Sequence, residues 1–378
     1  MKKKLCIIVT DAVSFNFLMK GQLEYLSNLD KYEITLISGG DEKQIADLES
    51  RNVGKYIYFP FSREIDIKKD IYCVCRLFIF FIFNRFDIVV YSTPKALLLG
   101  SISSFMTLQK KRIAIVRGRV YENYSGKKRK FFEVLDKLSL MISSKCIFIS
   151  KSLQQKFIEE KIVNYKKSRV LLQGSSNGLD LSWVSASLDQ SETLKLKSKI
   201  GYKESDFVAV CIGRVCIDKG VIELEEIFSS FKGFPDFKLV LVGRLEDEEA
   251  TSIVKKLSEF DNFFYFDQVS DVRCFFKLAN LHLFLSHREG FGNVALEAAG
   301  FGVPTFAYDV VGVRDSVCDG ISGKLFPFRG VELIIKEIKN YIHSRNKLEN
   351  NFSGSADWAA ENFSSIVVWD AYEKEFNK

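Results

Sequence analysis

The sequence lacks several features that would assign it to a common class of protein. No apolar run reaches the roughly 20 residues that a membrane-spanning helix needs. The eight cysteines are scattered without zinc-ligand spacing, so we interpret them as reduced, mostly buried thiols of a cytosolic protein. No Gly-x-Gly-x-x-Gly follows the first strand-like run, which argues against a dinucleotide-dependent oxidoreductase. The net charge of +6 is mild and no Lys/Arg stripe alternates with aromatic residues, so nucleic acid is not an expected partner.

What is present is the composition of a globular protein. With 378 residues, 47% of them hydrophobic and 27% charged, the chain is long enough for two domains. Three lysines and a short apolar run, residues 5–9, follow Met1. This run is too short for the core of a signal peptide, so we interpret it as the first strand.

Strand-like and helix-like segments alternate through both halves of the chain. The strand-like runs are residues 5–10, 32–38, 87–91, 112–116 and 145–149, and then residues 207–212, 237–242, 262–266, 281–285 and 304–308. We expect helices between them, for example over residues 17–29 and 218–231. Such alternation predicts parallel, doubly wound sheets that bind ligands beyond the carboxyl ends of their strands. Residues 173–180 are rich in Gly, Ser and Asn and indicate a linker between two domains.

Two glycine-containing segments follow buried strand-like runs of the second half. The first, residues 213–220, reads Gly-Arg-Val-Cys-Ile-Asp-Lys-Gly, and the second, residues 286–304, carries Glu289 at the strand end and Glu297 two helical turns further on. An arginine fork and a lysine suit phosphate oxygens, as do the N–H groups of a glycine loop and a helix N-terminus. Carboxylates beside them accept hydrogen bonds from sugar hydroxyls. The two segments together predict a site for a phosphorylated sugar.

These segments resemble the donor site of retaining GT-B glycosyltransferases, specifically glycosyltransferase family 4. That family carries Gly-Arg, four residues and Lys-Gly, followed later by two glutamates separated by seven residues. Gly213-Arg214, Lys219-Gly220, Glu289 and Glu297 reproduce that spacing. The resemblance implies an α/β protein of GT-B architecture, with two Rossmann-like doubly wound domains facing a deep cleft. The expected parts are an acceptor-binding domain, residues 1–175, a nucleotide-sugar-binding domain, residues 176–360, and a helix, residues 361–378, that crosses back onto the first domain.

The resemblance also implies roles for individual residues. Arg214 and Lys219 match the cations that bind the donor diphosphate, Glu289 matches the glutamate that contacts the donor sugar, and these three are the expected catalytic residues. The alternatives are a solvated loop arginine, a surface lysine, and, for Glu289, a carboxylate stabilised by the N-terminus of the following helix. The residues expected to bind the donor are Gly213, Phe291, Gly292, Asn293, Val294 and Glu297, the last accepting hydrogen bonds from the ribose.

The implied reaction is a retaining transfer from a UDP-sugar, carrying an N-acetylhexosamine or hexose, to a lipid-diphosphate-linked saccharide. Family members of this kind act in bacterial surface polysaccharide synthesis, such as O-antigen, capsule or other glycans. No Asp-x-Asp is present, so we expect no metal and no cofactor beyond the nucleotide sugar. The acidic run 246–249 is interpreted as the solvated start of a helix. The alternatives are another GT-B enzyme, such as a sugar-nucleotide epimerase, or a catalytically silent GT-B partner subunit.

The first half holds less generic signals for the acceptor. Segments at strand ends resemble those of bacterial family members that extend sugars on a lipid diphosphate carrier. The expected acceptor-binding residues are Ser14, Lys95, Arg117, Arg119 and Tyr121. Surface cations at strand ends are the alternative interpretation. The chain has only three histidines, none of them in the first 175 residues, where many relatives place one facing the donor sugar.

Two further segments suit contact with a membrane surface. Residues 127–130 read Lys-Lys-Arg-Lys and precede Phe131-Phe132, and residues 77–83 are apolar on every face of a helix. A solvated face and a buried helix, respectively, are the alternatives. We expect a cytoplasmic protein, peripheral on the inner face of the cytoplasmic membrane. Near the C-terminus, an apolar helix face is expected from Ile366, Trp369, Tyr372 and Phe376.

Overall fold

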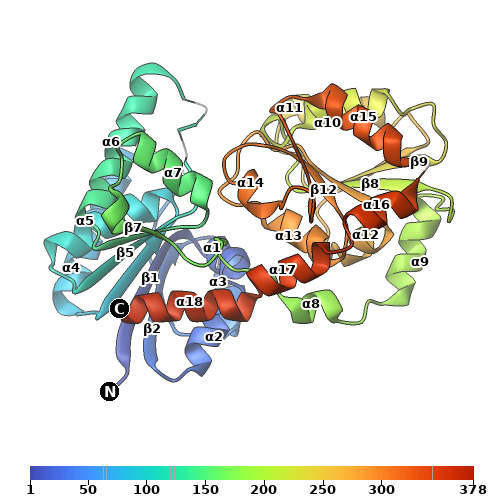
Figure 1. Ribbon diagram of the computed structural model, residues 1–378. Helices are drawn as coiled ribbons and strands as arrows, with labels where there is room; N and C mark the ends of the chain where they lie inside the picture. Colours follow the sequence, from blue (N-terminus) through green and yellow to red (C-terminus); the bar gives the residue numbers. More distant parts are fainter. Residues whose placement is uncertain (63, 65, 120, 123, 343) are drawn as a thin grey trace. The chain divides into compact units, whose positions relative to one another are not determined.

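The chain folds into two compact units, each built around one parallel sheet (Figure 1). The computed structural model describes residues 1–378 except 63, 65, 120, 123 and 343. Unit 1 comprises Met1–Asn177 and Ser365–Lys378, and unit 2 comprises Gly178–Ser364. The last helix, α18 (Ser365–Asn377), therefore belongs to unit 1 although the preceding helix, α17 (Ser355–Phe363), belongs to unit 2.

Unit 1 contains a seven-stranded parallel sheet in the order β3-β2-β1-β4-β5-β6-β7. The strands are β1 (Lys3–Asp11), β2 (Tyr32–Gly39), β3 (Lys55–Tyr58), β4 (Ile88–Ser92), β5 (Lys111–Val116), β6 (Lys145–Phe148) and β7 (Ser168–Val170). Helices cover both faces of such a sheet, so its central strands are apolar on both sides. This is why the five predicted runs of the first half are confirmed as strands, whereas the short edge strands β3 and β7 were not foreseen.

The helices of unit 1 flank this sheet (Figure 1). They are α1 (Ala12–Leu18), α2 (Gln22–Asn28), α3 (Glu42–Ser50), α4 (Ile67–Phe83), α5 (Pro94–Met106), α6 (Gly126–Ile142), α7 (Lys151–Glu159), the 3₁₀ turn η1 (Tyr165–Lys167) and α18. The prediction of one helix over residues 17–29 is wrong, because the chain breaks between α1 and α2. The break falls at Gly21, whose φ is +79° and whose missing Cβ would lie 2.4 Å from the Trp369 ring.

Helix α18 packs through an apolar face that includes Trp369, Tyr372 and Phe376, all buried. The Trp369 indole Nε1 donates to Asn177 Oδ1 at 2.8 Å. The prediction that Ile366 shares this face is wrong, since Ile366 is exposed and Val368 takes the inward position in the first turn.

Unit 2 contains a six-stranded parallel sheet in the order β10-β9-β8-β11-β12-β13. The strands are β8 (Phe207–Ile212), β9 (Phe237–Val242), β10 (Phe263–Phe266), β11 (Leu281–Phe284), β12 (Thr305–Tyr308) and β13 (Gly323–Phe326). The helical segments are α8 (Leu181–Ser185), α9 (Gln190–Lys199), η2 (Ile217–Lys219), α10 (Val221–Ser229), α11 (Glu248–Leu257), α12 (Arg273–Leu278), α13 (Asn293–Gly300), α14 (Val313–Ser316), α15 (Val331–Ile342), α16 (Arg345–Asn351) and α17. All five strand-like runs predicted in the second half are strands, and β13 was not foreseen.

The strand order of unit 2 reverses between β8 and β11. From β8 the chain adds strands on one side, and after β10 it returns to place β11 on the other side of β8. A crevice forms at such a switch point, beyond the carboxyl ends of the two strands, and ligands of parallel sheets bind there. The two glycine-containing segments follow these two strands.

Candidate functional site

The two segments meet at one edge of the unit 2 sheet. Strands β8 and β11 are paired, with Ala209 opposite Leu281 and Val210 opposite His282. The chain leaves β8 into residues 213–216 and η2, and it leaves β11 into the loop that precedes α13. Side chains 70 residues or more apart in the sequence are thereby brought to one place.

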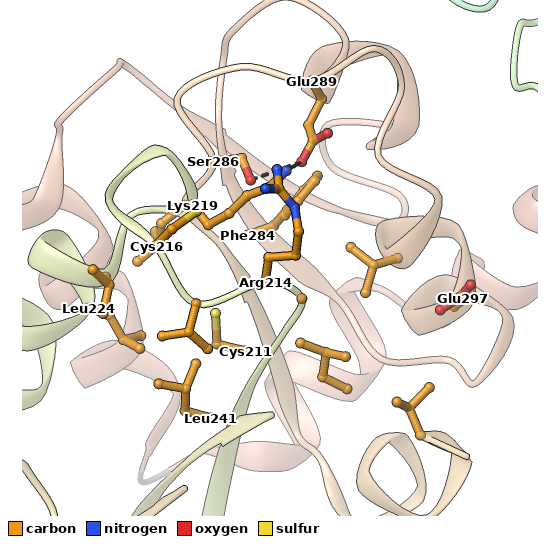
Figure 2. A pocket seen from close by; sticks show the side chains of 17 residues that line it. Cys211, Arg214, Cys216, Lys219, Leu224, Leu241, Phe284, Ser286, Glu289 and Glu297 are labelled. Carbon is orange, nitrogen blue, oxygen red and sulfur yellow. Dashed lines mark hydrogen bonds and ion pairs between the residues drawn. The ribbon is translucent and has the colours of Figure 1, made fainter. Parts of the chain in front are cut away.

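A cavity of about 310 Å³ lies at this edge, a size at the lower end of small-molecule sites. Its lining includes Arg214, Lys219, Glu289 and Glu297 (Figure 2). Of the other predicted donor residues, Gly213 and Val294 also line it, whereas the side chain of Phe291 is buried and Gly292 and Asn293 are not among the lining residues.

Lys219 and Glu289 form an ion pair inside the cavity. The Ser286 hydroxyl donates to the same Glu289 oxygen at 3.0 Å, and Figure 2 shows these three side chains turned toward one another. Both members of the pair are about four-fifths buried, at 21% and 18% side-chain exposure. Partial removal from water strengthens such a pair relative to one on the open surface.

Arg214 lines the cavity with a side chain that is 57% exposed, and it pairs with Glu246. Partial burial disfavours the charged guanidinium, but the hydrogen bond and charge of Glu246, with a contribution from Glu289, outweigh it and raise the Arg214 pKa. Glu246 was not foreseen as part of the site, because its acidic run was interpreted as the start of a helix. That interpretation is right for the next residue, since Asp247 caps α11 by accepting from the Ala250 N–H at 2.7 Å.

Glu297 lies on α13, apart from the Lys219–Glu289 pair (Figure 2). Burial disfavours its charged form and raises the pKa of its carboxyl group to about 7. Hydrogen-bond donors brought by a ligand would favour the charged form and lower that pKa.

The backbone holds the two segments against each other. Gly220 has φ of +80°, and a Cβ at this position would lie 2.4 Å from the Leu285 carbonyl oxygen. Only glycine permits both this conformation and this close approach. Immediately beyond, the His287 N–H donates to the Asp218 carbonyl oxygen at 2.9 Å.

Two side-chain contacts join the same segments. Together, the contacts of Asp218 and Glu223 with His287 and Arg288 form an inter-loop clamp. Arg288 Nη2 donates to Asp218 Oδ2 at 2.8 Å. His287 Nε2 lies 2.8 Å from Glu223 Oε1, within hydrogen-bond distance. The clamp fixes the distance between the elements that carry Lys219 and Glu289, and no sequence pattern pointed to it.

Known proteins share this architecture. Residues 192–357 match the family described as "Glycosyl transferases group 1". The chain is 31% identical over 367 residues to the capsular polysaccharide biosynthesis glycosyltransferase CapM of Staphylococcus aureus, with 95% of this chain and 93% of CapM covered. The chain belongs to the group 1 glycosyltransferases.

Solved structures show the fold of this glycosyltransferase to be GT-B. HepE of Anabaena, solved in complex with UDP-glucose, is similar with a TM-score of 0.79 at 17% identity, and both chains are covered completely. WaaG, a glycosyltransferase of lipopolysaccharide biosynthesis, is similar with a TM-score of 0.73 at 13% identity, covering 97% of this chain and 98% of WaaG. At such identities the likeness concerns the fold alone.

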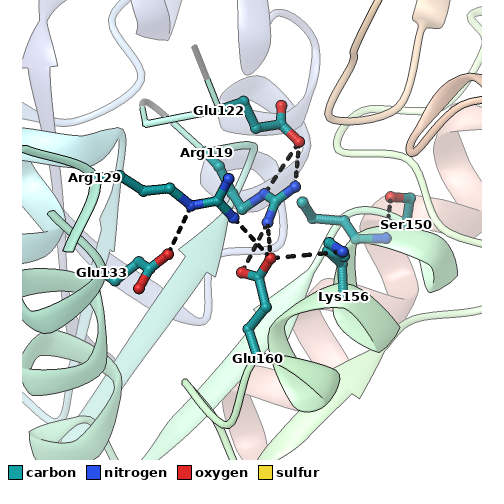
Figure 3. A network of polar contacts seen from close by, with 8 residues as sticks. Arg119, Glu122, Arg129, Glu133, Ser150, Lys156 and Glu160 are labelled. Carbon is teal, nitrogen blue, oxygen red and sulfur yellow. Dashed lines mark hydrogen bonds and ion pairs between the residues drawn. The ribbon is translucent and has the colours of Figure 1, made fainter. Parts of the chain in front are cut away.

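Unit 1 of the glycosyltransferase places the predicted acceptor residues in different surroundings. Lys95 pairs with Asp70 at 2.8 Å and its side chain is only 12% exposed. The Arg119 side chain is 4% exposed and is held by Glu122 and Glu160 (Figure 3). Both cations are mostly buried in unit 1 and paired with carboxylates, so their positions lend no support to acceptor binding. Tyr121 is buried as well.

Arg117 differs from these two cations. It follows β5 at the carboxyl edge of the sheet, and its Nε donates to Ser92 Oγ at 2.6 Å. Burial lowers its pKa, and among the described residues its buried Nη1 has no hydrogen-bond partner. A buried donor without a partner is costly, so Arg117 is suited to an anion. Ser14 is partly exposed on α1, directly after β1.

Two further observations concern metals and membranes. The described side chains include no group of three or more His, Cys, Asp or Glu arranged to hold a metal ion. Within the same residues, no helix has both the length and the apolar character needed to cross a bilayer.

Proposed function

We propose that this group 1 glycosyltransferase is a retaining family 4 hexosyltransferase that uses a UDP-sugar, carrying an N-acetylhexosamine or hexose. The acceptor is a lipid-diphosphate-linked saccharide in bacterial surface polysaccharide synthesis, of which capsule is the case supported by the likeness to CapM. The HepE complex with UDP-glucose supports the choice of UDP. The observation that carries the proposal is the gathering of Arg214, Lys219, Glu289 and Glu297 around one cavity.

Arg214 and Lys219 bind the diphosphate in this proposal. A diphosphate entering the cavity competes with Glu246 for Arg214 and with Glu289 for Lys219, the acids that now hold them. Exchange of partners leaves each cation paired and releases the Glu289 carboxylate to accept hydrogen bonds from sugar hydroxyls. Glu297 takes the ribose hydroxyls, which favour its charged form.

The chemical step breaks the bond between the sugar and the diphosphate. Its transition state resembles an oxocarbenium ion, and negative charge grows on the leaving phosphate oxygen. Arg214 and Lys219 stabilise that charge, and fixed donors of this kind contribute about 3 kcal/mol each. The same phosphate oxygen takes the proton of the acceptor hydroxyl, which attacks from the side of the leaving group, so the configuration is retained. The step uses neither a metal ion nor a separate general base.

The acceptor binds in unit 1 in this proposal, and Arg117 is the cation there whose position favours an anionic group. Ser14 lies at the same carboxyl edge of the sheet, after β1. Because a lipid-linked saccharide resides in a bilayer, we place the enzyme at the inner face of the cytoplasmic membrane.

The experiment is an assay of UDP release from a panel of UDP-sugars, with and without lipid-linked saccharides extracted from a capsule-producing bacterium. The proposal predicts release that depends on one sugar and on the acceptor, with a glycosylated lipid as the second product. A silent partner subunit would leave every donor unconsumed. An epimerase would convert the nucleotide sugar without an acceptor.

A further inference from the structure

Three helices of unit 1 form an outer layer on one side of its sheet. Helices α4, α5 and α6 connect successive strands from β3 to β6, and α5 contacts both of its neighbours (Figure 1). Helices that cover a sheet normally bury their apolar side chains and expose polar ones. This layer departs from that pattern.

Helix α6 exposes an apolar stripe. Phe131, Val134, Leu138 and Met141 are 56%, 54%, 37% and 62% exposed. Their spacing of three, four and three residues places them on one face of the helix. A row of large apolar side chains in water marks a surface that contacts something else.

The charges around the stripe are of one sign. Four lysines of α6 are exposed, namely Lys127, Lys128, Lys130 and Lys137. The two acids of the helix are not exposed. Glu133 bonds Arg129 at 2.8 Å, and burial raises the pKa of the Asp136 carboxyl group to about 7. The outward face of α6 is therefore apolar and cationic.

An ion-pair network connects the N-terminal part of α6 to α7 and to the segment after β5. Arg129 donates to Glu133 and, at 3.1 Å, to Glu160 at the end of α7, and Arg119 holds the same Glu160 with two bonds of 2.9 Å (Figure 3). Lys156 adds a weaker contact of 3.6 Å. The network anchors the cationic end of α6 to α7.

Helix α4 repeats the pattern in the same layer. Within residues 77–83, Leu77 and Phe81 are fully buried, whereas Ile79, Ile82 and Phe83 are exposed. The apolar run is thus neither wholly core nor wholly surface. At the C-terminal end of α5, the neighbouring exposed apolar residues are Phe105, Met106 and Leu108.

We propose that this outer layer, and the α6 stripe above all, docks on the surface of an anionic lipid bilayer. The inference rests on the proposed function in one respect, which is that the acceptor is membrane-borne. Apolar side chains enter the headgroup boundary while the lysine stems lie along it and their ammonium groups meet lipid phosphates. Each lysine near an anionic membrane strengthens binding about fivefold. A protein partner would need a groove that is both acidic and apolar. An anionic bilayer combines negative headgroups with an apolar interior, so it matches the lysines and the apolar stripe together. The N-terminus of α6 follows Arg117 in the same β5–α6 connection, so docking brings the membrane toward the proposed acceptor site.

The test is sedimentation of the full chain with vesicles of phosphatidylglycerol and phosphatidylcholine, compared with phosphatidylcholine alone. A stripe variant carries Phe131→Ser, Val134→Ser, Leu138→Ser and Met141→Ser. Its matched control replaces four exposed apolar residues of unit 2, Leu194, Phe234, Ile321 and Leu333, by Ser. We expect the wild type and the control to bind the anionic vesicles, and binding of the stripe variant to fall on the order of a hundredfold.

A charge variant replaces Lys127, Lys128, Lys130 and Lys137 by Gln, and its control replaces four exposed lysines of unit 2, Lys195, Lys255, Lys336 and Lys347. The charge variant should lose about fivefold in binding per lysine at low salt, whereas the control keeps the wild-type affinity.

Three outcomes overturn the proposal: a wild type that binds neither vesicle, a stripe variant that binds like its control, or a stripe that proves to hold two copies of the chain together instead of lipid. A thermal-shift measurement with UDP-sugars on the same variants separates this inference from the proposed function. Donor binding in unit 2 should be unchanged in all four variants. If no variant binds a UDP-sugar, the result counts against the donor site. If the donor binds but the vesicles do not, the result counts against the docking surface.

Discussion

Replacing Lys219 by Ala tests the donor site at its most enclosed cation. The change removes the partner of Glu289 and leaves that carboxylate, about four-fifths buried, with the Ser286 hydroxyl as a hydrogen-bond donor. Loss of a charged hydrogen bond of this kind costs about 2 kcal/mol of folding free energy. A domain near this size loses only a few degrees of Tm for each kcal/mol, so the variant should stay folded.

The effect on catalysis should be larger than that on stability. A fixed cation facing the leaving phosphate contributes about 3 kcal/mol to the transition state. Because about 1.4 kcal/mol corresponds to a factor of ten in rate, kcat/KM should fall roughly a hundredfold or more.

The assay measures UDP release under saturating acceptor, with circular dichroism to confirm folding. Lys232→Ala, at an exposed position of unit 2 outside the cavity lining, is the matched control and should keep the wild-type rate. A folded Lys219→Ala enzyme with wild-type kcat/KM would refute the assignment of this cation to the diphosphate.

Three further predictions concern the same site. Glu297 has a pKa raised by burial to about 7 from 4.5, so the folded state binds more protons than the unfolded state between these values, and stability should fall as pH rises through this window. Glu297→Gln should flatten that slope in thermal denaturation at pH 5 and pH 8; an unchanged slope would exclude the carboxyl group as its source. His287→Ala removes the hydrogen-bond partner of the buried Glu223 and loosens the inter-loop clamp, so the KM for donor should rise several-fold, with His287→Gln restoring part of the loss. If Ala and Gln behave alike in donor titrations, the clamp does not position the site. A chelator should leave UDP release intact, and loss of activity with rescue by manganese would contradict the metal-independent step.

Much of the fold could be predicted from the sequence, because strands buried on both faces of a parallel sheet are continuous apolar runs. Runs such as residues 207–212 and 237–242 match β8 and β9 to the residue. The short strands β3, β7 and β13 could not be found in this way, since they lie at sheet edges and are only partly buried. The break at Gly21 depends on Trp369, which is far away in the sequence.

The candidate site was predictable to the extent that it is carried by local spacing. Residues after β8 and after β11 lie together whenever these strands are neighbours, so the meeting of Lys219 and Glu289 follows from the topology. The acids that pair with Arg214 and His287 cannot be predicted from the strand topology. Glu246 reaches Arg214 from the loop after β9, and Glu223 reaches His287 from α10.

The acceptor side shows the limit of reasoning from charge at strand ends. Lys95 and Arg119 have the same local setting as Arg117. Asp70 on α4 and Glu160 just after α7 neutralise the first two in the folded chain. Among the described residues, the buried Nη1 of Arg117 has no hydrogen-bond partner, and this property depends on the tertiary structure.

The most direct test of the proposed donor site is a crystal structure of the protein with a bound UDP-sugar. We predict a diphosphate within hydrogen-bond distance of Arg214 and Lys219, with the ribose at Glu297 and the sugar at Glu289. A nucleotide that binds away from this cavity, with the Lys219–Glu289 pair undisturbed, would contradict it.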